Sequence, residues 1–73
     1  MATIAAMSWD VAESVFSQGY RAYQGAGPNA RCPYEAPGDK RIGLWVAGKD
    51  AARKRIARDT AWEQFERREK AVM

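Results

Sequence analysis

The residues of this chain that could carry out covalent or acid–base chemistry do not form a known catalytic set. Cys32 is the only cysteine, and the chain has no histidine to serve as its general base. A single cysteine without histidine also excludes an internal disulfide and leaves too few ligands for zinc. These residues predict a protein that is not an enzyme and that uses no metal or cofactor.

Two further patterns, a pair of glycines and a series of glutamates, resemble phosphate-binding or acid–base motifs only in part. Gly25-Ala26-Gly27 lacks the lysine and hydroxyl residue of a P-loop, and no predicted strand precedes it as in a dinucleotide-binding loop. Glu63, Glu66 and Glu69 stand among basic residues, which is typical of a solvated helix face with ion pairs. Neither pattern indicates phosphate cradling or acid–base catalysis.

The distribution of charge indicates a polyanionic partner. The net charge is +3, but residues 40–58 contain seven basic residues and one acidic residue, a balance of +6. The flanking segments 1–39 and 59–73 have balances of −2 and −1. A solvated helix face is the plain alternative. A block this dense nevertheless favours a partner that carries phosphate groups.

Hydrophobic periodicity predicts an all-α fold without strands, in one small domain of residues 1–73. The expected architecture is a helix–connector–helix hairpin with a short third helix or extension at the C-terminal end. Glycines and prolines stop the first helix and leave the connector without a helical or strand period. The predicted ranges are 8–24 for the first helix, 25–38 for the connector, 39–58 for the basic second helix and 60–72 for the C-terminal helix.

Capping residues predict where these helices begin. Ser8 or Asp10 caps the first helix, and Asp39 caps the second. The run Thr60-Ala61-Trp62-Glu63 has the pattern of a capping box and predicts a separate third helix. A single bent helix through residue 72 is the competing interpretation.

A repeated spacing links the first two helices. Residues 16–22 and 45–51 both have the pattern aromatic-x-x-Gly-x-x-Ala. Glycine inside a helix costs about 1 kcal/mol relative to alanine, so its presence needs a compensation. We predict that the two small-residue stripes face each other in a tight crossing, in preference to forming a ligand-binding notch.

Three short motifs, Gly19-Tyr20-x-Ala22, Cys32-Pro33-Tyr34 and Trp45-x-x-Gly48, are spaced around a glycine-bearing bend. With them, residues 12–56 resemble the ribosome modulation factor family of very small bacterial proteins. The resemblance implies two helices packed around a connector, with the eight motif residues mostly as framework. It also implies binding to the small ribosomal subunit near the 3′ end of its RNA, which silences translation and favours paired, inactive ribosomes.

Taken with the basic block, the resemblance predicts which residues contact RNA. Cys32 and Tyr34 are expected to fill the crevice between the helices, so that the connector backbone lies against RNA beside the basic helix. Trp45 and Gly48 are expected to point inward. The predicted RNA-contacting residues are Arg31, Lys40, Arg41, Lys49, Arg53 and Lys54.

The segment from Asp59 onward extends beyond the typical end of that family and supports a second hypothesis. Trp62 and Phe65 have the i,i+3 spacing of an anchor pair for a groove. In this alternative, the protein is a mobile-element or phage-type effector that binds and inhibits a host protein. The plainer interpretation is that both residues fold back onto the first two helices as additional core.

The first ten residues lack the basic flank and the long apolar run of a signal peptide or membrane span. We therefore expect a soluble, cytoplasmic protein that does not bind membranes. The sequence leaves the oligomeric state open, a homodimer included.

Overall fold

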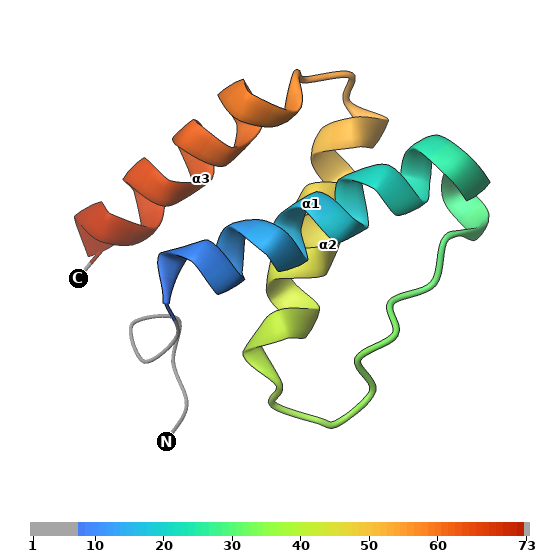
Figure 1. Ribbon diagram of the computed structural model, residues 1–73, viewed down its shortest axis with the longest axis horizontal. Coiled ribbons are helices and arrows are strands. Elements are labelled where there is room, and N and C mark those ends of the chain that lie inside the picture. Colours follow the sequence, from blue (N-terminus) through green and yellow to red (C-terminus); the bar gives the residue numbers. More distant parts are fainter. Residues whose placement is uncertain (1–7, 73) are drawn as a thin grey trace.

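The computed structural model describes residues 8–72, which form three α-helices and one short 3₁₀ helix (Figure 1). The α-helices are α1 (Trp9–Ala26), α2 (Lys40–Arg53) and α3 (Arg58–Val72), and the 3₁₀ helix η2 is Gly27–Asn29. None of the described residues is in a strand, so the all-α prediction is confirmed. Figure 1 shows α1 crossing α2, with α3 along one side and the connector looping around the other. No helix in this range is long and apolar enough to cross a membrane.

The ends of α1 follow from one capping side chain and one glycine. Ser8 Oγ accepts a hydrogen bond from the backbone N–H of Val11 at 3.2 Å, which confirms Ser8 as the cap. Gly25 was predicted to stop this helix but lies within it. The chain turns only at Gly27, which has a φ of 63° that glycine adopts without steric cost. α1 therefore ends two residues later than predicted.

The crossing of α1 and α2 depends on two glycines. A Cβ atom on Gly48 would lie 1.9 Å from the carbonyl oxygen of Phe16. A Cβ atom on Gly19 would lie 1.9 Å from the carbonyl oxygen of Trp45. Any side chain at either position would therefore collide with the opposite backbone. The predicted tight crossing is confirmed, and this close approach compensates for two glycines in helix interiors.

The core surrounds this crossing and continues beneath α3. Phe16 and Leu44 are fully buried, and Trp45 is 3% exposed. Trp62 of α3 packs edge-on against Phe16, with ring centroids 5.3 Å apart. Phe65 packs beside it as a partly buried residue. α3 is thus part of the same hydrophobic core as the helix pair.

α2 ends five residues earlier than predicted because a Schellman motif closes it. The backbone N–H of Ile56 bonds to the carbonyl of Ala51, and that of Arg55 bonds to the carbonyl of Ala52, both at 3.0 Å. Arg55 holds the left-handed position with a φ of 61° and is the one described non-glycine residue with positive φ. Glycine is the usual residue there, and a side chain at this φ costs about 1 kcal/mol. The predicted range 39–58 and the single bent helix are both wrong.

α3 begins two residues before the predicted start. Arg58 is its first residue, so Thr60 lies in the first turn and does not cap the helix, and the capping-box prediction is wrong. Nη1 of Arg58 donates to Oε2 of Glu13 at 3.0 Å and to Oγ of Ser17 at 2.9 Å. The hydrogen bond with Glu13 raises the pKa of Arg58. These bonds fasten the start of α3 to α1.

Candidate nucleic-acid interface

η2 and the connector that follows it are held against α1 and α2 by side-chain hydrogen bonds. Lys49 Nζ of α2 donates to the backbone carbonyl oxygens of Ala30 at 2.7 Å and Pro28 at 3.3 Å. The hydroxyl of Tyr34 donates to Oε1 of Gln18 in α1 at 2.8 Å. The path of the connector is therefore set by α1 and α2 together.

Cys32 and Tyr34 fill space between the connector and the helices, in agreement with the prediction. Both are half-buried and pack against the core. Cys32 Sγ lies 3.6 Å from the carbonyl oxygen of Tyr34 as a weak hydrogen-bond donor. The guanidinium of Arg41 lies over the Tyr34 ring, 4.4 Å from its centroid. This cation–π contact adds a third link between connector and α2.

A shallow groove of about 330 Å³ runs between the connector and α2. Its floor is mainly apolar, and Val46 in it is 48% exposed. Trp45 forms a wall of the groove but is too deeply buried to offer its ring face for stacking. The lining residues are Ala30, Cys32, Trp45, Val46, Lys49, Asp50 and Arg53.

Four of the six predicted RNA-contacting residues have charges that face solvent. Arg31 and Lys40 are exposed and form no ion pair with another residue of the described range. Arg53 and Lys54 are exposed and share the carboxylate of Asp50, at 2.7 and 3.0 Å. These two hydrogen bonds, that of Arg53 first, lower the pKa of Asp50. Exposed pairs of this kind contribute little stability, so the two cations can exchange Asp50 for a phosphate.

The other two predicted residues contact the connector, Lys49 by hydrogen bonds and the exposed Arg41 through the Tyr34 ring. Lys49 was expected to project toward RNA, but its ammonium group holds the connector carbonyls. Arg41 makes a two-nitrogen contact with the carboxylate of Asp39, which also caps α2 by accepting the Arg41 backbone N–H at 2.9 Å. The side-chain hydrogen bonds from Arg41 lower the pKa of Asp39. Lys49 and Arg41 therefore position the connector.

The remaining motif residues have mostly structural positions. Tyr20 is half-buried, and its hydroxyl donates to the carbonyl oxygen of Ile56 at 2.7 Å, which links α1 to the turn after α2. Ala22 is half-buried against the core, whereas Pro33 is exposed on the connector. With the two crossing glycines, Trp45, Cys32 and Tyr34, seven of the eight motif residues support the helix–connector–helix unit.

The proposed anchor pair on α3 is not an exposed anchor. Trp62 is 8% exposed, and its ring contacts Trp9, Phe16 and Phe65 with centroid separations of 6.0, 5.3 and 5.6 Å. Phe65 is half-buried and also packs on Phe16, 5.6 Å away. The interpretation that both residues add to the core is confirmed. A host protein could engage Trp62 only if α3 left the core.

Two structurally important positions were not singled out from the sequence. Arg58 lay within the range predicted for the second helix, and its bonds to Glu13 and Ser17 join residues more than forty positions apart. Arg55 was counted only as part of the basic block, because an arginine carries no sequence signal for a left-handed turn. Among residues 8–72, no cluster of three side chains suited to metal binding is present.

Comparison with known proteins gives no relative from which a function could be inferred. No family model matches the chain, and no curated protein or solved structure matches it. The resemblance to ribosome modulation factor therefore rests on the short motifs between residues 19 and 48.

Replacing Lys49 with methionine should loosen the connector. The change keeps most of the aliphatic stem but removes the ammonium group that binds Ala30 and Pro28, so we expect a loss of about 1–2 kcal/mol in the free energy of unfolding. Lys40→Met, on the same helix and without an ion pair in the described range, should change stability by no more than about 0.5 kcal/mol. Urea denaturation measures both. Equal effects would show that Lys49 does not hold the connector.

Proposed function

We propose that this protein is a non-catalytic RNA-binding protein that binds the small ribosomal subunit and represses translation. The observation that carries the proposal is the groove between connector and α2, which has an apolar floor and solvent-facing cations beside it. The resemblance of residues 12–56 to ribosome modulation factor supplies the ribosomal target.

The chemistry of the groove suits single-stranded RNA. Proteins recognise unpaired RNA by contacting splayed-out bases and neighbouring phosphates. Val46 offers an exposed apolar surface for one base, while Arg53 on the same helix and Arg31 on the connector offer charges for the phosphates. The bonds from Lys49, Tyr34 and Arg41 fix the connector beforehand, so little ordering is needed when RNA binds.

Binding at the 3′ end of the small-subunit RNA accounts for repression. A protein on the segment where the message pairs with the ribosome competes directly with initiation, and no catalysis is required. The exposed arginine and lysine side chains supply the sequence-independent part of the affinity. Position on the subunit then comes from the shape of the connector and groove.

Fluorescence anisotropy with a labelled fragment of the 3′ end of small-subunit RNA tests this proposal. The two phosphate contacts of Arg31 and Arg53 predict that log affinity falls against log salt with a slope of about −1.4 or steeper. Val46→Glu should weaken binding by roughly tenfold or more, because a carboxylate in the groove repels the RNA.

Val11 provides a matched control, since it is also 48% exposed but lies on α1. Val11→Glu makes the same change in charge and should bind RNA almost as well as the parent protein. If the two variants lose affinity equally, or if the parent does not bind the fragment, the groove is not an RNA site.

A further inference from the structure

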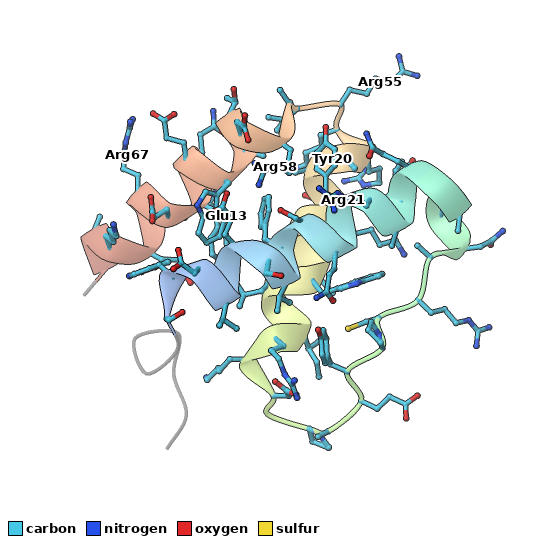
Figure 2. All side chains as sticks on the ribbon, in the orientation of Figure 1. Glu13, Tyr20, Arg21, Arg55, Arg58 and Arg67 are labelled. Atoms are coloured by element: carbon cyan, nitrogen blue, oxygen red, sulfur yellow. The ribbon has the colours of Figure 1, made fainter. Side chains whose placement is uncertain are left out.

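The last residue of α2 and the turn that follows it present three consecutive basic residues, Arg53, Lys54 and Arg55. Figure 2 shows the Arg55 side chain extending away from the protein at this corner. Its guanidinium makes no hydrogen bond or ion pair with another residue of the described range, whereas Arg53 and Lys54 share Asp50. Arg55 is therefore the cation of the turn that is available without breaking a contact.

The backbone conformation of Arg55 makes an arginine at this position unexpected. The Schellman motif is closed by the backbone N–H groups of Arg55 and Ile56, so the turn does not need the arginine side chain. Glycine would adopt the φ of 61° without steric cost. A cation is favourable near the end of α2, but Arg53 and Lys54 already provide two. The side chain of Arg55 is thus best explained by a contact outside the chain.

The turn is also held rigidly enough to present that side chain. The Tyr20 hydroxyl bonds to the carbonyl oxygen of Ile56, the residue after Arg55, at 2.7 Å. Arg58, three residues further on, is bonded to Glu13 and Ser17 of α1. The chain directly after Arg55 is therefore fixed to α1 at two points, Ile56 and Arg58, and Figure 2 shows Tyr20 and Arg58 near this corner.

We propose that Arg55 is a phosphate-binding residue and that residues 53–55 anchor the RNA backbone next to the groove. An arginine guanidinium binds a phosphate through two parallel N–H groups, and Asp50 leaves the turn with a net balance of +2. Arg53 belongs both to this turn and to the groove lining, so one RNA strand can pass from the groove to the turn. This inference rests on the proposed RNA-binding function and adds a second contact region to it.

Arg55→Gly separates binding from stability. Glycine fits the backbone conformation, so the midpoint of thermal unfolding should stay the same or rise by about 4 °C. Affinity for a mixed-sequence single-stranded RNA oligonucleotide should fall roughly threefold to tenfold, and the salt slope should become shallower by about 0.7. Arg55→Lys should keep most of the affinity and the slope. Arg67→Gln, at the opposite end of the molecule in Figure 2, is the matched single-charge control and should bind like the parent.

Measuring the same variants with purified small ribosomal subunits separates this inference from the proposed function. If the parent binds the oligonucleotide and Arg55→Gly binds as tightly as Arg67→Gln, the role of Arg55 is wrong and the proposed function stands. A lowered unfolding midpoint for Arg55→Gly would also overturn it, because the side chain would then have a partner within the protein. If the parent binds the oligonucleotide but not the subunits, the ribosomal assignment fails and Arg55 is judged on the oligonucleotide alone. Binding to neither overturns both.

Discussion

Replacing Gly48 with alanine should push α1 and α2 apart and lower the free energy of unfolding by at least about 2 kcal/mol. The added Cβ would lie 1.9 Å from the Phe16 carbonyl oxygen, and a backbone atom cannot rotate aside as a flexible side chain can. The helices must separate, which loosens the packing of Phe16 and Trp45 around the crossing. Chemical denaturation followed by circular dichroism measures the loss.

Gly43→Ala is the control for this prediction, because Gly43 lies in the same helix and a Cβ there meets nothing within 4 Å. Only helix propensity then changes, and the protein should be stabilised by about 0.5–1 kcal/mol. The two glycine variants should therefore shift stability in opposite directions. A Gly48→Ala protein as stable as the Gly43→Ala protein would show that the backbones do not touch at the crossing.

Trp62→Ala should destabilise the protein by about 3–5 kcal/mol, because it leaves a cavity among Trp9, Phe16 and Phe65. The loss is large for a chain of 73 residues, whose total stability is expected to be about 4–11 kcal/mol. Thermal and urea unfolding should both show it. Arg67→Ala, an exposed change on the same helix, should stay within about 0.5 kcal/mol of the parent.

Trp62→Ala also distinguishes the two hypotheses for α3, which are that it belongs to the core and that it binds a host protein. If Trp62→Ala unfolds at the same urea concentration as the parent, α3 does not belong to the core in solution. Trp62 would then be accessible to a partner, which would support the hypothesis that α3 binds a host protein. A large loss of stability leaves α3 as a structural helix.

The sequence predicts the helix crossing well because the evidence for it is local. A glycine in a helix interior has a cost, and the same spacing in residues 16–22 and 45–51 indicates that two such glycines meet. The end of α2 is different. It depends on the left-handed φ of Arg55, and an arginine gives no indication of that conformation. The cap at Asp39 was visible in the sequence, but the Schellman motif at residues 51–56 was not.

The candidate site could be predicted only in part, because the buried face of α2 is a local property and the path of the connector is not. Helical periodicity predicts that Trp45 and Gly48 of α2 point inward, and both are buried. It does not give the path of the connector, on which the partners of Lys49 depend. Lys49 was therefore predicted to contact RNA, although its ammonium group bonds to Ala30 and Pro28. Long-range bonds of this kind become visible only in the three-dimensional structure.

Sedimentation of the tagged protein with ribosomal particles tests the central claim most directly. In a low-salt sucrose gradient, the protein should travel with small ribosomal subunits and should leave them as salt increases, because phosphate contacts are lost to counterions. Val46→Glu should remain near the top of the gradient under the low-salt conditions, whereas Val11→Glu should sediment with the subunits. If the parent protein stays at the top even at low salt, it does not bind the ribosome and the proposed function is wrong.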